Sequence, residues 1–374
     1  MRILFLHNRY RLEGGEERAV AEIAALLERR GHTVEILERS SAALGGARAA
    51  RALLRGGEDP DEVGRTVRRL RADVVHAHNL HPLFGWRALA AARRQGARTV
   101  LHLHNFRLYC EIGIAYRDGA PCHQCRAQNT LPGLIHRCRG SLPESAVYAA
   151  ALATQQRRLL ERADRLIVLS QAHGKLLQEH GLPPGNVAVV PNFAPSPAER
   201  PPASAPGHVL VAGRLVEEKG FDTAVRAAIT AGVPLVVAGQ GPDEGRLRDL
   251  AGGAEVRFTG WISRGELAEL RANAAAVLAP SRCEEACPYS VLEALATGLP
   301  VLVSDRGGLP EMAPAENVLP AEDEGAWTER LRALWRDEQG RRSSGEAALE
   351  LARGKFGEDR AYAGLMEAYA ANGD

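Results

Sequence analysis

The sequence from Pro280 to Glu311 reads PSRCEEACPYSVLEALATGLPVLVSDRGGLPE, and its pattern predicts a strand–loop–helix–strand unit. The apolar run AAAVLAP ends at Pro280, so Ser281–Tyr289 is expected to be a loop at the carboxyl end of a strand. A helix is predicted to follow, and the apolar run VLVSD then predicts a second buried strand. This stretch indicates a parallel α/β sheet.

Two glutamates frame this loop and helix start. Glu285 and Glu293 stand eight positions apart, one in the loop and one in the helix. Backbone amides between them would face an anion, because the first N–H groups of a helix have no partner within the helix. A carboxylate pair around an anion site suits a ligand with hydroxyl groups at its ends and phosphates in its middle. A nucleotide-sugar has that shape.

The same alternation of short apolar runs and helical patterns extends over the whole chain. The first half offers RILFLH, TVEIL, DVVHAH, RTVLHLH, RLIVLS and NVAVVP as strands, and the second offers HVLVAG, PLVVAG, EVRFTG, AAVLAP, PVLVSD and NVLP. Such alternation predicts parallel strands with crossover helices. Residues 191–206 hold six prolines and no periodicity, which is typical of a linker. Two doubly wound units are therefore predicted, with ligands at the carboxyl ends of their strands and a cleft between them.

Composition narrows the functional class. With 47 Lys and Arg against 46 Asp and Glu, the net charge of +1 argues against a dedicated nucleic-acid binder. The N-terminal MRILFLHN is one strand-length apolar run without the long apolar core of a signal peptide, and no apolar run elsewhere has membrane-spanning length. We therefore expect a cytoplasmic protein with reduced thiols.

Several motifs resemble those of the retaining glycosyltransferases of the GT-B fold, in family four. They occur in that family's order along nearly the whole chain: GGEERAV (residues 14–20), LHLHNFRLYC (101–110), VPNF (190–193), GRLVEEKG (213–220), VVAGQGP (236–242), FTGWIS (258–263) and the E-x7-E segment. The resemblance implies two Rossmann-like domains. The first covers residues 1–190 with an insertion at 105–141, and the second covers 207–355. A final helix within residues 356–374 is expected to pack back onto the first domain.

The resemblance also assigns residues to the donor. Arg214 and Lys219 would neutralise the departing diphosphate in place of a metal, which is the step where negative charge grows. Lys219 is one of only three lysines in a chain that otherwise uses arginine. Glycines in these motifs would let backbone amides approach the diphosphate: Gly14, Gly15, Gly213 and Gly239. Solvated charges and tight turns are the alternative explanation of these residues.

The two glutamates acquire distinct implied roles. Glu285 would contact hydroxyls of the donor sugar, and the amides of Ala286 and Cys287 would point at phosphate, whereas Pro288 has no N–H to offer. Glu293 would bind the ribose hydroxyls. Its alternative is a capping box with Ser290, in which Glu293 would only bond the backbone at a helix start.

Histidines cluster at two predicted strand ends. His76 and His78 lie in VVHAHN, and His102 and His104 lie in VLHLHNF. A spacing of two on a strand puts both members of a pair on one face, so each pair is either half of a metal site or a set of satisfied core imidazoles. By resemblance His104 contacts the substrate near the reacting sugar, and His78 with Asn79 are candidates for the acceptor side.

The insertion at 105–141 carries four cysteines. Cys110, Cys122, Cys125 and Cys138 include one C-x-x-C, and together they offer four ligands for a structural zinc; plain buried thiols are the alternative. His123 and His136 are spare candidates. No metal is expected in the chemistry itself.

An acidic tripeptide and a basic segment of the first domain each have a structural alternative to a functional role. Asp59-Pro60-Asp61 matches the D-x-D of metal-dependent glycosyltransferases of the other large fold, but its polar setting favours a solvated turn. Arg48, Arg51 and Arg55 form a basic segment that is a solvated surface or a contact for anionic lipid or a lipid-diphosphate acceptor.

These observations predict an enzyme that moves a sugar from a nucleotide donor to an acceptor hydroxyl with retention of configuration, in polysaccharide or glycolipid assembly. The expected acceptor is a glycan or a lipid-linked molecule, peripheral contact with a membrane is compatible with the basic segment, and no nucleic acid is expected. Two alternatives remain. One is a nucleotide-sugar epimerase or hydrolase on a similar scaffold, and the other is a catalytically silent nucleotide-sugar-binding protein.

Overall fold

The computed structural model describes residues 1–9, 14–40, 44–194 and 207–370. Its internal contacts divide the chain into two compact units. Unit 1 contains Met1–Ala115, His123–Val190 and the C-terminal stretch from Tyr362, while unit 2 contains Tyr116–Cys122 and the described part of Pro191–Ala361. Most of the expected linker, at 195–206, and the last residues of the expected final helix, at 371–374, lie outside the described residues.

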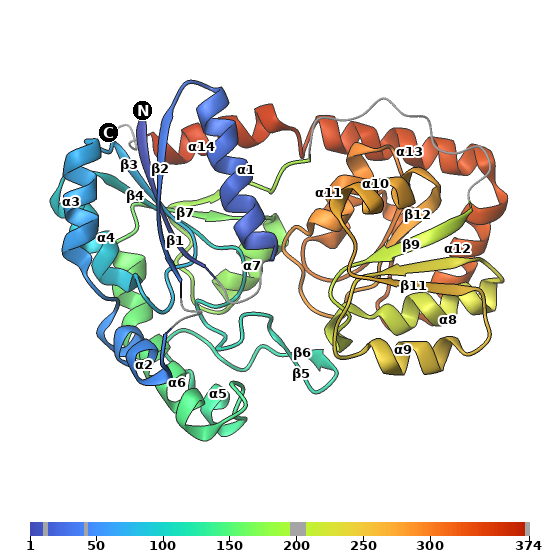
Figure 1. The fold of residues 1–374 in the computed structure, drawn as a ribbon, viewed down its shortest axis with the longest axis horizontal. Coiled ribbons are helices and arrows are strands. Elements are labelled where there is room, and N and C mark those ends of the chain that lie inside the picture. Colours follow the sequence, from blue (N-terminus) through green and yellow to red (C-terminus); the bar gives the residue numbers. More distant parts are fainter. Residues whose placement is uncertain (10–13, 41–43, 195–206, 371–374) are drawn as a thin grey trace. The chain divides into compact units, whose positions relative to one another are not determined.

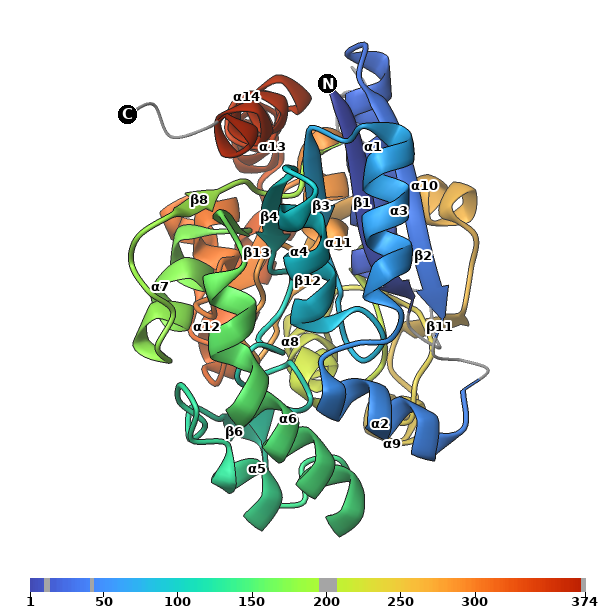
Figure 2. The same cartoon turned by 90° about the vertical axis from the view of Figure 1, so that its left-hand side faces the viewer.

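Unit 1 is built on a six-stranded parallel sheet. Its strand order is β2 (Thr33–Ser40), β1 (Arg2–Arg9), β3 (Val74–Ala77), β4 (Arg98–His102), β7 (Arg165–Val168), β8 (Val187–Val189). Helices precede or follow these strands: α1 (Gly15–Arg29), α2 (Gly46–Arg55), α3 (Pro60–Leu70), α4 (Gly85–Arg94), α5 (Leu131–Ile135), α6 (Leu142–Glu161) and α7 (Gln171–Glu179). Figure 1 shows α3 and α4 on one face of the strands and α1 on the other. Figure 2 shows α3, α4 and α6 side by side on the first of these faces.

The C-terminal helix α14 (Glu358–Tyr369) contributes to unit 1 through its later residues. The hydroxyl of Tyr362 lies 3.0 Å from Nε2 of His32, and Arg98 donates to the carbonyl of Ala368 at 3.3 Å. The Tyr369 hydroxyl lies 2.6 Å from Nδ1 of the buried His76. A segment at the end of the sequence thus completes the packing around the first strands.

Unit 2 repeats the architecture. Its parallel sheet has the order β11 (Val256–Gly260), β10 (Leu235–Ala238), β9 (His208–Ala212), β12 (Ala274–Ala279), β13 (Val301–Ser304), β14 (Val318–Leu319). One face is covered by α8 (Phe221–Ala231), α9 (Glu244–Ala251) and α12 (Glu324–Arg336), and the other by α10 (Arg264–Ala272), α11 (Tyr289–Ala296) and α13 (Glu338–Arg353) (Figure 1). Three short 3₁₀ turns complete it: η1 (Glu217–Lys219), η2 (Leu309–Met312) and η3 (Ala315–Asn317).

The central strands explain why both sheets are parallel. In β1 the side chains of Ile3, Leu4, Phe5 and Leu6 are all fully buried, so the strand has no solvent face. Helices on both faces of a parallel sheet require such continuous apolar strands. Each of the twelve predicted strands is present, which confirms two Rossmann-like α/β domains. The insertion adds a small antiparallel hairpin, β5 (Tyr116–Arg117) with β6 (Ala120–Pro121), that the strand pattern did not predict.

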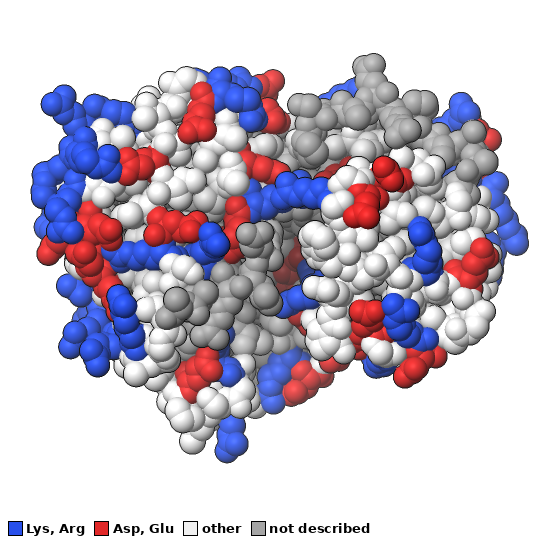
Figure 3. Space-filling view, viewed as in Figure 1, with Lys and Arg blue, Asp and Glu red and all other residues white. Residues whose placement is uncertain are grey.

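Two general properties bear on function. None of the described helices is both long enough and apolar enough to cross a membrane. On the face drawn in Figure 3, acidic and basic side chains are interspersed over both units. The distribution on this face accords with the near-zero net charge.

Candidate functional site

Lys219 is positioned by a tight turn at the carboxyl end of β9. It ends the 3₁₀ turn η1, and the next residue, Gly220, has φ of 65°. A Cβ on Gly220 would lie 2.0 Å from the carbonyl oxygen of Pro280, at the end of β12. Only glycine therefore allows this turn to pack against the neighbouring strand end, and this close approach brings Lys219 to the loop that follows β12.

Glu285 meets Lys219 in that loop. The ammonium Nζ of Lys219 forms an ion pair with Oε1 of Glu285, and the side chains are 28% and 15% exposed. The hydroxyl of Ser281 donates to the same carboxylate oxygen at 3.1 Å. Burial alone would lower the pKa of Lys219, but the charge and hydrogen bond of Glu285, together with the neighbouring Cys283 and Glu218, outweigh it, so the pKa is raised. The structure thus joins two predicted site residues that are 66 positions apart.

Further contacts hold the two segments together. The amides of Arg282 and Cys283 both donate to the carbonyl of Glu218, at 2.9 and 3.2 Å. The guanidinium of Arg282 also forms an ion pair with Asp222 at 2.8 Å, near the start of α8. Although burial raises the pKa of Asp222, the hydrogen bonds and charge of Arg282 lower it overall. Arg282 and Asp222 were not predicted as part of the site, since nothing in their local sequence marks them as partners.

Glycines allow a close approach at two more strand ends. Gly239, after β10, has φ of 137°, and a Cβ there would lie 1.9 Å from the carbonyl oxygen of Gly213. Gly307, after β13, has φ of 56°, and its Cβ would lie 2.3 Å from the carbonyl oxygen of Glu285. Gly308 donates its amide to that same carbonyl at 2.6 Å. Gly307 was not among the predicted site residues, although the repeated glycines of DRGGLPE at a strand end indicate such a close approach.

The segment before α11 presents backbone amides. Within the described residues, the N–H groups of Ala286 and Cys287 have no hydrogen-bond acceptor. The Cys287 carbonyl accepts from the side chain of Asn192 at 2.9 Å, which fixes the peptide. Burial raises the pKa of the Cys287 thiol to about 12, so this cysteine is not a nucleophile near neutral pH. The arrangement supports an anion-binding role for these amides.

Glu293 is not a helix cap. Helix α11 begins at Tyr289 with Pro288 as its N-cap and has no side-chain capping bond, so the capping-box alternative with Ser290 is wrong. The carboxylate of Glu293 instead pairs with Arg271 of α10, with 2.5 Å between Oε2 and Nη1. With Pro288 as the N-cap, the helix starts two residues before the position that a Ser290 cap would require.

Arg214 is not part of the ion pair between Lys219 and Glu285. Its side chain is 59% exposed and pairs with Glu218 at 3.2 Å. It follows Gly213 at the end of β9, so it shares the strand-end location of Lys219.

We name Lys219, Glu285 and the amides of residues 286 and 287 the Lys219–Glu285 cluster.

The four histidines of unit 1 form a stacked array, which we name the histidine cluster: His76, His78, His102 and His104. Ring centroids are 4.3 Å apart within the first pair and 4.2 Å apart within the second. Across the pairs, His76 Nε2 lies 3.2 Å from His102 Nδ1, and His78 Nδ1 lies 2.9 Å from His104 Nε2. The parallel pairing of β3 with β4 produces this alignment.

Burial controls the protonation of the cluster. It lowers the pKa of His76 to about 3, and it places the pKa of His78, His102 and His104 well below the ordinary value. The rings are therefore neutral near pH 7. A neutral imidazole can accept a hydrogen bond or bind a metal through its free nitrogen.

A pocket of about 40 Å³ opens beside this cluster, and its lining includes His78, Asn79, His104 and Glu16. Asn79 is held by its side-chain bond to the carbonyl of Asn8 at 2.7 Å. Nearby in sequence to Glu16, Gly14 is the N-cap of α1 and Gly15 its first residue. The structure thus gathers the predicted acceptor-side residues, His78 and Asn79, with His104 around one space in unit 1.

The four cysteines of the insertion are divided between the two units. All four are half-buried. Cys122 follows hairpin β5–β6, which groups with unit 2, whereas Cys110, Cys125 and Cys138 belong to unit 1. Among the described residues, the one group of His, Cys, Asp or Glu with suitably close ligand atoms consists of histidines. Zinc binding by the cysteines stays a prediction for metal analysis.

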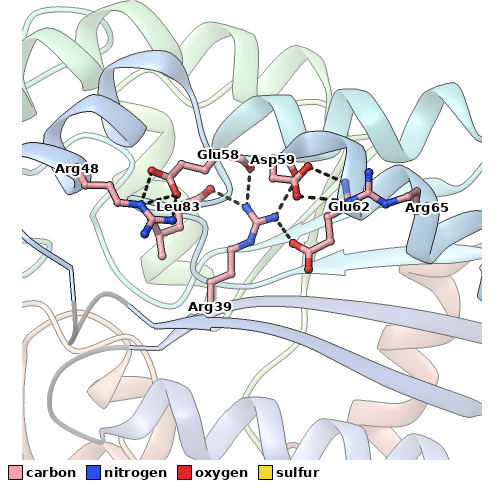
Figure 4. Close-up of polar contacts among 7 residues, drawn as sticks. All are labelled: Arg39, Arg48, Glu58, Asp59, Glu62, Arg65 and Leu83. Atoms are coloured by element: carbon pink, nitrogen blue, oxygen red, sulfur yellow. Dashed lines mark hydrogen bonds and ion pairs between the residues drawn. The ribbon is translucent and has the colours of Figure 1, made fainter.

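Asp59 has a structural role. Its side chain accepts from the amide of Glu62 and so caps α3. Figure 4 shows the guanidinium of Arg39 between the backbone carbonyls of Glu58, Asp59 and Leu83 and the carboxylate of Glu62, at 2.5–3.0 Å. The Asp59-Pro60-Asp61 segment therefore caps helix α3, and Arg39 stabilises the turn that precedes the helix.

The basic segment on α2 is partly neutralised. Arg48 forms a bidentate contact with Glu58, at 2.9–3.2 Å (Figure 4). Glu58 lies in the following loop, so the absence of acids inside α2 did not reveal this partner. Leu54 on the same helix is 45% exposed.

Two Rossmann-like units with these strand-end clusters define the GT-B glycosyltransferase fold. Solved structures share it over 98% of this chain. The sucrose-phosphate synthase of Thermosynechococcus elongatus has a TM-score of 0.71 at 16% identity over 98% of its own length. The Anabaena protein Alr3699/HepE, solved in complex with UDP, has a TM-score of 0.66 at 18% identity over 99% of its length. At these identities the likeness concerns the fold alone.

Sequence comparison identifies the family. The model for the glycosyl transferase 4-like domain matches residues 14–192, and the model for glycosyl transferases group 1 matches residues 196–351. The chain belongs to the group 1 glycosyltransferases.

Two curated relatives come from Mycobacterium tuberculosis. A GDP-mannose-dependent alpha-mannosyltransferase (strain CDC 1551 / Oshkosh) is 32% identical over 253 residues, covering 65% of this chain and 58% of the relative. A GDP-mannose-dependent alpha-(1-6)-phosphatidylinositol dimannoside mannosyltransferase (strain ATCC 25177 / H37Ra) is 41% identical over 111 residues, covering 28% of this chain and 29% of the relative. The chain therefore matches between about a third and three fifths of these relatives' length.

Proposed function

We propose that this protein transfers a glycosyl residue from a nucleotide-sugar to an acceptor hydroxyl with retention of anomeric configuration. The observation that carries the proposal is the Lys219–Glu285 cluster. A cation, a carboxylate and two backbone amides without acceptors meet there at the carboxyl ends of parallel strands. Ligands of open α/β sheets bind at those ends.

The cluster supplies what departure of a nucleoside diphosphate requires. As the bond between the anomeric carbon and the phosphate oxygen breaks, negative charge grows on the diphosphate, and the Lys219 ammonium and exposed Arg214 guanidinium stabilise it. The bond from the anomeric carbon to the acceptor oxygen forms on the same face, and the acceptor's proton passes to the leaving phosphate oxygen. Because side chains and amides meet the phosphate charge, the proposed chemistry requires no metal cofactor.

The glutamates orient the donor in this proposal. Glu285 accepts hydrogen bonds from sugar hydroxyls, and Glu293 accepts from the ribose. Both carboxylates already pair with a cation, Glu285 with Lys219 and Glu293 with Arg271, and these pairs hold the side chains in place. Gly14, Gly15, Gly213 and Gly239 keep backbone close to the phosphates.

The acceptor side is proposed to involve the pocket beside His78, Asn79 and His104. These neutral, hydrogen-bonding groups suit a hydroxylated acceptor, a glycan or a lipid-linked one. A relative named for phosphatidylinositol dimannoside supports a lipid-linked acceptor. Exposed Leu54 beside the arginines of α2 would allow peripheral membrane contact from a cytoplasmic location.

The test is a donor screen followed by transfer assays. Relatives are named for GDP-mannose, while a fold neighbour was solved with UDP and UDP-glucose, so GDP-, UDP- and ADP-sugars form the minimal set. One of them should raise the melting temperature and be consumed only when an acceptor is added, and NMR should show the same anomeric configuration in donor and product. Consumption without acceptor would favour the epimerase or hydrolase, binding without turnover would favour the silent protein, and an inverted product would refute retention.

A further inference from the structure

Three histidines of unit 1 have the spacing of metal ligands. His76, His78 and His102 each offer a ring nitrogen, and these atoms all lie within 4.8 Å of one another. All three side chains are buried, at 0%, 3% and 2% exposure. They come from the carboxyl ends of adjacent strands β3 and β4, so the sheet fixes their separation.

Second contacts orient these rings. Tyr369 lies at 2.6 Å from Nδ1 of His76, and His104 lies at 2.9 Å from Nδ1 of His78. Both contacts use Nδ1, so Nε2 of His76 and Nε2 of His78 remain as the candidate metal ligands. A metal-bound histidine ordinarily has such a partner on its other nitrogen, which fixes the ring and its tautomer.

Two buried nitrogens in this group lack partners. Nε2 of His78 and Nε2 of His102 have no hydrogen-bond partner among the described residues. A buried polar atom without a partner destabilises the folded state, so unpartnered atoms of this kind call for an explanation. Stacking of neutral rings explains the packing of the array, but it does not satisfy these lone pairs or N–H groups.

We propose that His76, His78 and His102 bind one divalent transition-metal ion of the zinc class. Three imidazoles and no carboxylate form a ligand set that selects zinc, copper or nickel over magnesium or calcium. Zn–N bonds of about 2.0–2.1 Å place ligand nitrogens about 3.4 Å apart in a tetrahedron. The 3.2 Å between His76 Nε2 and His102 Nδ1 is already close to this distance, so His102 binds through Nδ1, and Nε2 of His78 is the unpartnered nitrogen that the ion satisfies.

The ion has a structural role in this proposal. It ties β3 to β4 and, through the Tyr369 contact with His76, braces helix α14. Because His78 contacts His104, it also holds the wall of the adjacent pocket. The site is distinct from the cysteines of the insertion and does not depend on the proposed glycosyl transfer.

The test uses the full chain, freed of metal by chelation and titrated with Zn²⁺ by calorimetry. We expect one site per chain and a rise of about 5 °C or more in a melting transition at saturating zinc. Co²⁺ should give visible d–d bands without an intense near-ultraviolet thiolate band, because the ligands are nitrogen atoms. His76→Asn and His102→Asn should each abolish binding. His173→Asn is the matched control, since His173 is buried in the same unit with an unpartnered Nε2 but lies outside the group.

Two more variants keep the test decisive. Tyr369→Phe should retain one zinc per chain with an affinity about tenfold lower, because it removes only the orienting contact. The pair Cys122→Ser with Cys125→Ser should bind zinc as the wild type does. The proposal is overturned if the wild type binds no zinc, if the histidine variants still bind it, or if the cysteine variant loses the only site. If the histidine variants do not fold, unchanged affinity in Tyr369→Phe overturns it.

Discussion

Replacing Glu293 by Gln separates a structural from a ligand-binding role for this carboxylate. Oε2 of Glu293 lies 2.5 Å from Nη1 of Arg271, and the two side chains are 11% and 9% exposed. Gln keeps the shape of Glu but removes its charge. A hydrogen bond between charged groups contributes about 1.5–3 kcal/mol, and removing one partner of a buried pair costs about 3–5 kcal/mol. We therefore expect Glu293→Gln to lower the free energy of unfolding by about 3 kcal/mol.

A double-mutant cycle with Arg271→Met measures the pair itself. Urea unfolding of the wild type, both single variants and the double variant should give a coupling energy of at least about 1.5 kcal/mol. Calorimetry with the nucleotide found in the donor screen should show weaker binding to Glu293→Gln by about tenfold, because a ribose hydrogen bond is lost. Unchanged unfolding would refute the contribution of the ion pair. Weaker folding with unchanged nucleotide affinity would refute the ribose contact.

Three further variants test other parts of the structure. Lys219→Ala should lower kcat by about 10²–10³-fold with little change in donor affinity, because the charge of Lys219 acts mainly as the diphosphate leaves. Lys175→Ala is the control, and an unchanged kcat in Lys219→Ala would contradict this role. Gly239→Ala should destabilise unit 2 by about 3 kcal/mol, as its Cβ would lie 1.9 Å from a carbonyl oxygen, whereas Gly245→Ala in α9, with nothing within 4 Å, should be neutral or stabilising in thermal melts. Burial raises the pKa of Glu111 to about 7, above its value in the unfolded chain, so the free energy of unfolding should fall as pH rises from about 4.5 to 7 and level off above. Glu111→Gln should flatten this pH dependence in thermal melts between pH 5 and 8, and an unchanged pH dependence would refute the assignment.

The strands, and the location of Lys219 and Glu285 after strand ends, were accessible from sequence because these signals are local, whereas the ion pair between the two residues was not predicted. A continuous apolar run such as Ile3–Leu6 predicts a buried parallel strand wherever it occurs. Lys219 and Glu285 each directly follow such a run, and parallel strands bring their carboxyl ends to one edge. The structure confirms the two predicted α/β domains, each built on a six-stranded parallel sheet.

The partners of the site residues were not accessible, because they depend on which helices and strands become neighbours. Arg271 is 22 positions from Glu293, on a different helix, and nothing in either local sequence links them. The capping-box pattern at Ser290 was misleading because a cap requires the helix to start at one particular residue. The histidine cluster likewise required the pairing of β3 with β4, while the spacing of two predicted only that each pair shares a face.

The placement of α14 has a consequence for biosynthesis. The contact between His76 and Tyr369 spans 293 positions, and all of unit 2 is encoded between them. During translation the second Rossmann unit therefore emerges and can fold before the first receives its last helix, which reverses the usual N-terminal-first order. A gene fragment that stops after β8 would express a first unit lacking its closing helix. A circular permutant that begins at α14 and continues into β1 would restore that unit as one uninterrupted segment.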